Sequence, residues 1–457
     1  MPDKTVRVAS GQGFWGDWQE APKLQVRRGP IDYVMLDYLA EITMSILEKQ
    51  RERDPRAGYA RDFVDLVIDL APDLVARGVR VVSNAGGVNP ESCRDLLVER
   101  LADVETQRPV RIAIVRGDDL MARLDDLLAA GHELRNMETG EPLEAVRERV
   151  TAANAYMGAG PILRALRQAA DVVVTGRSTD TALTYAPLIH EFGWAPDDWD
   201  RIAAGVVAGH INECGAQASG GNTLFRWREV DLIEPGYPII EASADGAFVV
   251  TKHPSLGGRV NWASVTEQLV YEMGDPTEYI TPDCVADFST IRLEDLGADR
   301  VRVTGVRGRP RPGSLKVSIA YRAGYKATGS LTYAYPDAYE KAALADRVLR
   351  GRLERLGLRF EEIRTEYVGA GACHGPLAGP PDPELPEVGL LISVRGESRA
   401  DVERFTRELA PLILAGPPTV TGFAAGRPKI HEVMAYWPAL IDRAVVEEVV
   451  EVEVTEA

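Results

Sequence analysis

Residues 63–87, FVDLVIDLAPDLVARGVRVVSNAGG, contain the pattern that decides the fold. The apolar residues of the first half recur at intervals of three and four, which places them on one face of a helix, and Gly78 follows as a C-terminal stop. Residues 79–83 then form a short apolar run that ends at a glycine-rich loop, as expected for a strand buried on both faces. The segment therefore predicts a helix, a buried strand and a polar loop in succession.

The same order of elements recurs through the N-terminal half of the chain. Further apolar runs that end in polar or glycine-rich loops occupy residues 6–10, 33–36, 110–115 and 172–175. This repetition predicts an α/β fold with a mostly parallel, doubly wound sheet and helices on both faces. From about residue 227 the pattern changes to alternating, strand-like segments and two helices, which predicts an α+β half. We expect a Rossmann-like α/β domain over residues 1–230 and an α+β domain over residues 231–457.

The composition excludes several classes of protein. The 457 residues carry a formal net charge of −17, which disfavours nucleic acid and anionic membranes as partners. No apolar stretch reaches the length of a membrane span, and residues 1–5 lack the apolar core of a signal peptide, so we expect a cytoplasmic protein. The four cysteines are far apart, which supports neither a disulfide framework nor a metal site.

The first predicted strand leads into GQGFWG, residues 11–16, which matches the G-x-G-x-x-G pattern of dinucleotide-binding loops. Asp37 follows at about the distance of the acid that binds a ribose hydroxyl in such sites. Asp17 counts against this interpretation, because it would place a carboxylate beside the pyrophosphate. An NAD(P) site, a site for another ligand and a purely structural turn all stay open. The candidate binding residues are Gly11, Gly13, Gly16, Asp17 and Asp37.

Three later loops belong to the same edge of the predicted sheet, where ligands of open α/β sheets bind, and they are residues 84–89, 116–119 and 176–181. In the third of them, Arg177 offers a planar donor group for a carboxylate or phosphate, and the two hydroxyls that follow can cap a helix with Asp180 in its first turn. The structural alternative is an N-terminal cap with an ion pair between Arg177 and Asp180. The candidate binding residues here are Asn84, Gly86, Gly87, Arg177, Ser178 and Thr179, and Asp180 is a candidate catalytic residue.

The richest polar cluster follows a predicted helix over residues 203–214. His210 and Glu213 share one face of that helix, so the carboxylate can orient the imidazole for acid–base catalysis, although a structural pair is the alternative. Nothing in the sequence lowers the pKa of the Cys214 thiol, and an HxxE order alone is weak evidence for a metal. The glycine-rich continuation adds Gly220, Gly221 and Asn222 as candidate binding residues.

Two further features come from the second half. His374 lies in a glycine-bounded turn, where it can reach a ligand or remain solvated. Residues 300–316 concentrate six cations in an acidic chain. The first interpretation of this segment is a hairpin with solvated flanks, and the second is an anion site for a phosphate-bearing substrate such as an acyl-CoA.

Several of these segments together resemble the acyclic terpene utilisation family, AtuA. The resemblance extends over nearly the whole chain, through residues 11–17, 37–41, 84–87, 176–180, 209–222, 265–272, 274–288 and 416–429. It implies a role near the breakdown of acyclic terpenes, where the intermediates are branched acyl-CoA thioesters. Longer family members continue into a small C-terminal domain, so the resemblance also implies a separately encoded small subunit as a partner.

We therefore expect an enzyme that acts on a small carboxylate or an acyl-CoA thioester by lyase or hydratase chemistry. His210, Glu213 and Asp180 would transfer protons, loop amides would stabilise an oxyanion, and Arg177 would anchor a carboxylate. One alternative is an NAD(P)-dependent oxidoreductase that uses the loop at residues 11–16. Another is a non-catalytic accessory subunit of an acyl-CoA enzyme complex. Self-association into a homo-oligomer is the common default.

Overall fold

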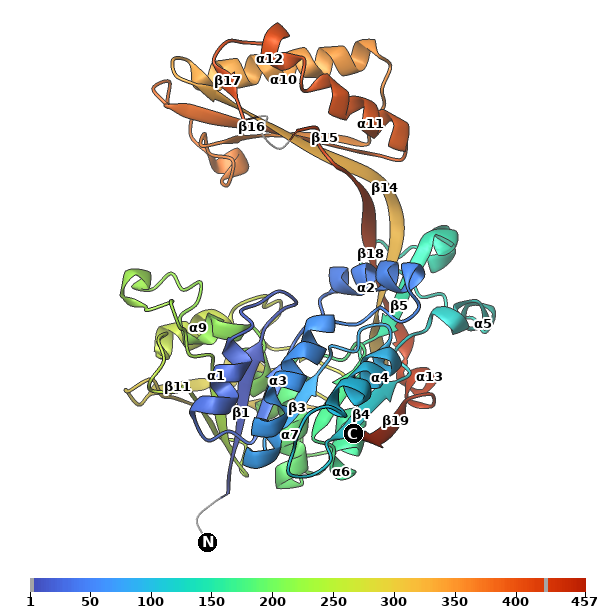
Figure 1. Cartoon of the computed structure of the whole chain (residues 1–457), viewed down its shortest axis with the longest axis vertical. Coiled ribbons are helices and arrows are strands. Elements are labelled where there is room, and N and C mark those ends of the chain that lie inside the picture. Colours follow the sequence, from blue (N-terminus) through green and yellow to red (C-terminus); the bar gives the residue numbers. More distant parts are fainter. Residues whose placement is uncertain (1–3, 423–425) are drawn as a thin grey trace. The chain divides into compact units, whose positions relative to one another are not determined.

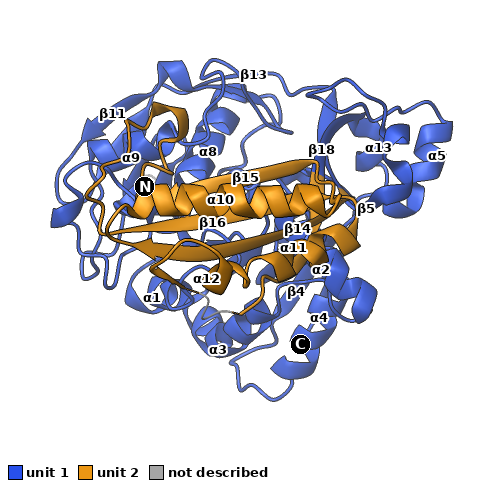
Figure 2. Ribbon diagram, turned by 90° about the horizontal axis from the view of Figure 1, so that it is seen from above, with its two compact units in different colours: residues 1–320, 436–457 blue, residues 321–435 orange. Residues whose placement is uncertain are grey.

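The computed structural model describes residues 4–422 and 426–457. Residues 1–3, at the start of the segment considered for a signal peptide, and residues 423–425, within the segment 416–429, lie outside the described residues. The chain forms two compact units, which Figure 2 distinguishes by colour. Unit 1 comprises residues 1–320 and 436–457, and unit 2 comprises residues 321–435.

Unit 1 is built on a ten-stranded sheet with the order β11-β12-β8-β7-β1-β2-β3-β6-β4-β19. Its five central strands are parallel, and they are β1 (Thr5–Gln12), β2 (Tyr33–Leu36), β3 (Arg80–Ser83), β6 (Val172–Thr175) and β4 (Arg111–Arg116). Antiparallel strands extend both edges, and they are β7 (Ile239–Ser243), β8 (Phe248–Thr251), β11 (Arg292–Asp295), β12 (Val301–Thr304) and β19 (Glu451–Glu456). The expected mostly parallel sheet in the N-terminal half is confirmed.

Helices cover both faces of this sheet, as expected for a doubly wound fold. One face carries α1 (Ala21–Arg28), α3 (Arg61–Arg77) and α4 (Pro90–Leu101), which lie in one layer in Figure 1. The other face carries α6 (Ala159–Arg167), α7 (Ala182–Phe192) and α8 (Trp199–Asn212). Helix α3 buries the apolar stripe from Phe63 to Leu74, and each large side chain of this stripe contributes ~1.5–3 kcal/mol. It ends at Gly78, whose φ of 67° is left-handed.

The compact units differ from the expected division at residues 230 and 231. Strands β7, β8, β11, β12 and β19 all lie beyond residue 230, yet they belong to the same sheet as β1 to β6. Their backbone hydrogen bonds to this sheet make them part of the first core. The chain leaves unit 1 within β14 (Ser314–Ala334) and returns to it within β18 (Ile430–Asp442).

Unit 2 has the order strand, helix, strand, strand, two helices, strand, followed by the start of β18. Its elements are β14 from residue 321, α10 (Ala338–Arg355), β15 (Glu362–Val368), β16 (Glu387–Gly396), α11 (Arg399–Glu408), α12 (Leu412–Ala415), β17 (Val420–Thr421) and β18 up to residue 435. The strands form an antiparallel sheet in the order β15-β16-β14-β17, which is a split βαβ arrangement. Helices α10 and α11 pack on one face of this sheet. The expected α+β character of the C-terminal half is confirmed.

The remaining helices and strands of unit 1 lie outside its main sheet and the helices that cover it. They are α2 (Glu41–Arg53), α5 (Leu124–Ala129), β5 (Val150–Ala155), α9 (Trp262–Leu269), β9 (Tyr279–Ile280), β10 (Val285–Asp287), β13 (Arg307–Arg309) and α13 (Arg443–Glu447). Strands β9, β10 and β13 form a small separate sheet. Within the described residues, no helix is both long enough and apolar enough to cross a membrane.

Candidate functional site

A cavity of about 520 Å³ lies in unit 1 beyond the carboxyl ends of β1, β2 and β6. Three parts of its wall are the loops that follow these strands, and a fourth is the segment after α8. Its charged lining consists of six carboxyl side chains and one guanidinium, from Asp17, Asp37, Glu41, Asp180, Glu213, Glu272 and Arg177. The cavity therefore brings together residues from the loops after β1 and β6 that the sequence analysis singled out, but none from the loops after β3 and β4.

Close packing within the fold explains the glycines at the end of β1 and in the loop that follows it. Gly11 lies within β1, where an added Cβ would come within 2.6 Å of the Leu36 side chain. A Cβ on Gly13 would lie 2.6 Å from the backbone nitrogen of Gly215. Gly16 has a φ of 106°, which side chains rarely tolerate. The G-x-G-x-x-G pattern is thus explained by close packing and one turn.

The amide of this loop that would face a phosphate is already bonded within the protein. The Gly13 amide donates to Asp17 Oδ2 at 2.9 Å. The other oxygen of Asp17 accepts hydrogen bonds from the Trp18 amide and from the Tyr237 hydroxyl, both at 2.7 Å. Helix α1 begins only at Ala21, so its N-terminus does not adjoin the glycines. These contacts count against a bound pyrophosphate, which needs free amides and no carboxylate.

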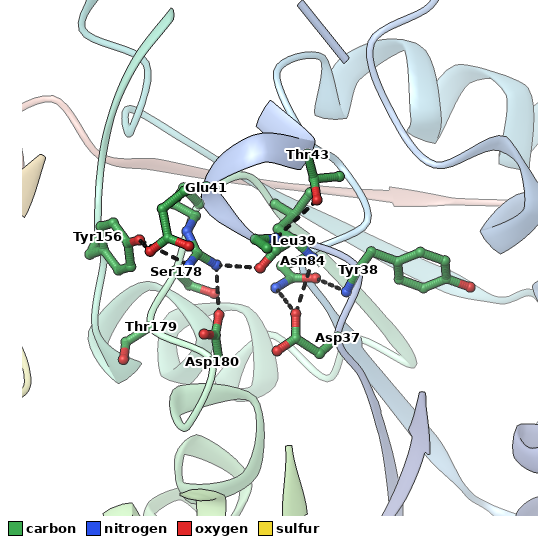
Figure 3. Close-up of polar contacts among 12 residues, drawn as sticks. Asp37, Tyr38, Leu39, Glu41, Thr43, Asn84, Tyr156, Ser178, Thr179 and Asp180 are labelled. Atoms are coloured by element: carbon green, nitrogen blue, oxygen red, sulfur yellow. Dashed lines mark hydrogen bonds and ion pairs between the residues drawn. The ribbon is translucent and has the colours of Figure 1, made fainter. Parts of the chain in front are cut away.

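Asp37 is buried at the end of β2 and is held by Asn84. Its Oδ1 accepts from the Asn84 side-chain amide at 2.7 Å and from the Leu39 amide at 3.1 Å, while Asn84 Oδ1 accepts from the Tyr38 amide (Figure 3). Burial, together with the nearby charge of Asp180, raises the pKa of Asp37 well above its usual value. Asp37 lines the cavity, whereas Asn84 orients it from behind.

The glycines of the Asn84 loop pack against backbone and side chains and do not line the cavity. A Cβ on Gly86 would lie 2.7 Å from the carbonyl oxygen of Thr175. Gly87 has a φ of 55°, and a Cβ there would lie 2.4 Å from the Leu47 side chain. Both positions let the β3 turn approach its neighbours closely.

Arg177 is buried and its terminal nitrogens are bonded within the protein. Nη1 donates to Asp180 Oδ1 at 2.6 Å and to the Leu39 carbonyl at 2.8 Å, and Nη2 donates to the Tyr156 hydroxyl at 3.0 Å. The guanidinium also lies 4.2 Å from the centroid of the Tyr156 ring. Burial raises the pKa of Asp180, although the Arg177 charge opposes this effect. The ion pair that was the structural alternative is therefore present.

Glu41, the first residue of α2, extends this network (Figure 3). It accepts a hydrogen bond of 2.5 Å from the Tyr156 hydroxyl and lies 3.6 Å from Lys316 Nζ. Burial acts to raise the pKa of Glu41, but the Tyr156 hydrogen bond and the charges of Arg177 and Lys316 outweigh it, and the net pKa is lowered. Glu41 is thus a stable anion at the N-terminus of a helix.

The loop of Arg177 rests on a buried carboxyl, that of Asp118. Asp118 Oδ2 accepts from the Arg177 amide at 2.8 Å and from the Asn154 side chain at 2.9 Å. Burial raises the pKa of Asp118 to about 7. A Cβ on Gly176 would lie 2.4 Å from Asp118 Oδ1, which explains the glycine. Asp118 supports the cavity wall from below.

Ser178 and Thr179 do not act as the expected helix caps. Helix α7 begins at Ala182, and no side chain caps its first turn. The Ser178 hydroxyl lies 3.3 Å from that of Thr175, and the Thr179 amide donates to a backbone carbonyl at 2.8 Å. Neither residue lines the cavity. Their contacts hold the turn between β6 and α7.

His210, in the last turn of α8, is held in one orientation. Its Nε2 lies 3.0 Å from the Gln268 carbonyl oxygen, so Nε2 carries a proton, and Nδ1 lies 3.1 Å from Glu213 Oε1. The Gln268 side chain in turn donates to the His210 carbonyl at 2.7 Å. Tyr279 and Phe288 pack edge-on against the imidazole. The lone pair or second proton of the ring therefore faces Glu213.

The pKa values of both His210 and Glu213 are raised. Burial raises the pKa of Glu213 to about 7, although its hydrogen bond to His210 opposes the shift. Burial lowers the pKa of His210, but the hydrogen bond and charge of Glu213 raise it by more, so the net shift is upward. Glu213 lines the cavity and the 2 % exposed His210 side chain does not. Glu213 is therefore the member of the pair that a ligand in the cavity can contact.

The segment after Glu213 forms another part of the wall. Cys214 lines the cavity, and burial raises the pKa of its thiol, which keeps it protonated. Gly220 has a φ of 96° and ends a short 3-10 helix. Gly221 and Asn222 line the cavity, whereas Gly220 does not. The expected binding role thus concentrates on the last two residues of this glycine-rich stretch.

His374 lies in unit 2, on an exposed loop between β15 and β16. It is not among the residues that line the cavity of unit 1. Its side chain is accessible to solvent, as the second interpretation of the glycine-bounded turn expected.

The six cations of residues 300–316 each have a carboxylate partner. The pairs are Arg300 with Glu241, Arg302 with Glu294, Arg307 with Asp200, Arg309 with Glu278, Arg311 with Glu447 and Lys316 with Glu41, at distances from 2.6 to 3.6 Å. These pairs neutralise the positive charge of the segment. The expected hairpin is wrong, because the three strands β12, β13 and β14 of this segment lie in three different sheets. The paired cations also give the anion-site interpretation no support.

Sequence reasoning assigned no individual role to several residues of the site, among them Glu41, Glu272, Tyr156 and Asp118. Glu41 and Glu272 belong to segments of the family resemblance, but their carboxylates carried no motif of their own. Tyr156 and Asp118 reach Arg177 only through the fold, since β5 and the loop after β4 are brought beside β6. In the part of the chain that the structure describes, no group of three or more His, Cys, Asp or Glu side chains has the arrangement of a metal site.

The comparison with family models decides the family of the chain. The model of the acyclic terpene utilisation family protein AtuA matches residues 6–452. The chain belongs to the AtuA family. The match spans both units and therefore includes the cavity and the split βαβ unit of this AtuA-family chain. The comparison with curated proteins and the comparison with solved structures each found no match.

Proposed function

We propose that this AtuA-family chain is an enzyme that transfers a proton next to the carbonyl of an acyl thioester, in a hydratase or dehydratase reaction. The observation that carries the proposal is Glu213, a cavity-lining carboxyl with a pKa of about 7 that is backed by an oriented imidazole. General acid–base catalysis is most effective when the pKa lies near the working pH. Such a group can both accept and return a proton.

The reaction requires no oxidant or reductant. In the dehydration direction, Glu213 takes the proton from the carbon next to the carbonyl, and the hydroxyl on the following carbon leaves as water with the proton that Glu213 returns. Hydration is the reverse. The enolate oxygen that develops needs a donor, and Asp37, whose raised pKa favours the protonated acid, would supply it.

The bound group would be a thioester carbonyl in preference to a free carboxylate. The terminal nitrogens of Arg177 already bond Asp180, Leu39 and Tyr156, so they do not form the carboxylate anchor that the sequence suggested. The contacts of Gly13 and Asp17 likewise give a nicotinamide dinucleotide no support. A thioester carbonyl is neutral and needs only one or two hydrogen-bond donors.

Hydrogen exchange tests this function with a panel of compounds, before any one substrate is identified. Short linear and branched acyl thioesters are incubated with the purified protein in D₂O, and mass spectrometry measures deuterium uptake and the gain or loss of water. We expect uptake with at least one thioester, and Glu213→Gln should abolish it. Glu138→Gln, a change at an exposed residue outside the cavity wall, is the matched control. Equal uptake with Glu213→Gln would remove Glu213 from the reaction, and activity that appears only with a partner protein would favour an accessory subunit.

A further inference from the structure

The charges around the cavity restrict the chemical class of group that can enter it. Six carboxyl side chains line the wall, against one guanidinium. That guanidinium is already compensated, because Arg177 Nη1 lies 2.6 Å from Asp180 Oδ1. Among the described residues of this wall, a carboxylate or phosphate that entered would meet no uncommitted cation and would be repelled by the remaining carboxylates.

The second requirement of an anion site, a set of free backbone amides, is also missing where the glycine-rich loop suggested one. The Gly13 amide donates to Asp17, and the same carboxylate accepts from Trp18 and Tyr237. Asp17 therefore occupies the position that an anion would take. The loop carries its own internal anion.

The cations of residues 300–316 do not supply the positive charge that an anion in the cavity would need. The six cations of residues 300–316 are each paired with a carboxylate. Among these cations only Lys316 approaches the cavity wall, and it lies beside Glu41. Three independent observations thus disfavour an anionic ligand group.

The wall does offer donors to a neutral oxygen. The side-chain amides of Gln217 and Asn222 line it, and buried carboxyls with raised pKa values donate when protonated. A single N–H or O–H donor suits a carbonyl oxygen, which accepts without carrying a full charge.

From this arrangement we infer that the cavity admits an uncharged, hydrogen-bond-accepting end of its ligand, such as a thioester or amide carbonyl, and excludes carboxylates and phosphates. The inference rests on the proposed function for the location of the site and deepens it by naming the substrate class. If the acyl group is attached to a phosphate-bearing carrier, the phosphates lie outside the cavity.

Three ligands of one chain length test the inference. Butanamide, butanoate and butylamine are neutral, anionic and cationic at pH 6, and their binding is measured by saturation-transfer NMR with the full-length protein. We expect butanamide to bind at least tenfold more tightly than butanoate. Higher salt should reduce the ratio of butanamide affinity to butanoate affinity, because it screens the carboxylates. Butylamine should bind more tightly than butanoate, because the carboxylates that repel an anion attract a cation. Butanoate that binds as tightly as butanamide would overturn the inference.

A matched pair of variants locates the effect. Glu272→Gln removes one carboxylate from the wall and should narrow the ratio of butanamide to butanoate affinity about threefold, whereas Glu138→Gln, with the same change in net charge outside the wall, should leave it unchanged. An unchanged ratio in Glu272→Gln would contradict the charge argument. Glu213→Gln should retain the order of the three ligands even if the proposed reaction fails, so the two proposals fail separately.

Discussion

Two ion or hydrogen-bond pairs beside the cavity, each with a buried base, have the same spacing and different chemistry. Arg177 with Asp180 and His210 with Glu213 are both separated by three residues, and both bases are 2 % exposed. Arginine stays charged at any pH in the working range, so the first pair is a permanent ion pair. Imidazole loses its proton near neutrality, so the second pair holds a proton that can move. The comparison teaches that the type of base, and not the spacing, decides whether a buried carboxyl is structural or reactive.

The largest effect is expected from breaking the permanent pair. Arg177→Met leaves Asp180 without its cation and removes the hydrogen bonds to Leu39 and Tyr156. We expect a loss of ~3–5 kcal/mol in the stability of unit 1, measured by urea denaturation followed by tryptophan fluorescence. The double variant Arg177→Met with Asp180→Asn should recover part of this loss. A single variant that is as stable as the wild type would show that the pair has no structural role.

Breaking the second pair should affect turnover more than stability. His210→Asn keeps a donor towards Gln268 but removes the group that opposes the upward shift of the Glu213 pKa. We expect the turnover of the proposed reaction at pH 7 to fall by about 10²-fold, and the acid limb of its pH profile to move to higher pH. An acid limb that stays in place would mean that His210 does not share the proton of Glu213.

The pH dependence of stability sharpens the same contrast. The pKa of Glu213 rises from 4.5 to about 7 in the folded state, so the folded chain binds a proton that the unfolded chain has released. The proton on Glu213 contributes fully to the free energy of unfolding below about pH 4.5, and this contribution is lost as the pH rises through 7. The free energy of unfolding should therefore fall by ~2–3 kcal/mol between pH 5 and pH 8. The urea midpoint of Glu213→Gln should therefore fall less over this range than that of the wild type. Parallel curves would show that the carboxyl is ionised throughout.

A surface pair should give the smallest effect. Arg302 and Glu294 lie 2.7 Å apart on adjacent strands, with side chains 48 % and 61 % exposed. Water and salt screen such pairs, so Arg302→Gln should cost less than ~1 kcal/mol and leave ligand binding unchanged. A loss comparable to that of Arg177→Met would mean that burial does not distinguish the two pairs. Urea denaturation under the same conditions makes the measurements comparable.

Much of the fold of the N-terminal half could be predicted from the sequence. The strands β1, β2, β3, β4 and β6 and the helix α3 lie where the apolar runs and the three-and-four periodicity placed them. Local patterns contain this information because buried parallel strands are continuously apolar. The division into units could not be predicted, because β7, β8, β11, β12 and β19 join the first sheet through long-range pairing.

The candidate site could be predicted only in outline. The loops after β1, β2 and β6 do converge, as strand order in an open sheet requires, but which side chains face the cavity depends on packing. Asn84 and His210 lie behind residues that line the cavity, and the glycines at 11, 86 and 87 serve the packing of the chain. A motif records the residue types of a loop, whereas the direction of each side chain is decided by the neighbours that the fold provides.

The pairing of β19 has a consequence for the order of folding. Strand β19 pairs with β4 from Glu451 to Glu456, although the chain passes through all of unit 2 between them. During synthesis, the exposed edge of β4 must therefore wait until a complete second unit has left the ribosome. Unit 2 is one continuous stretch of the chain and can fold during this interval. The sheet that carries the cavity is completed only afterwards.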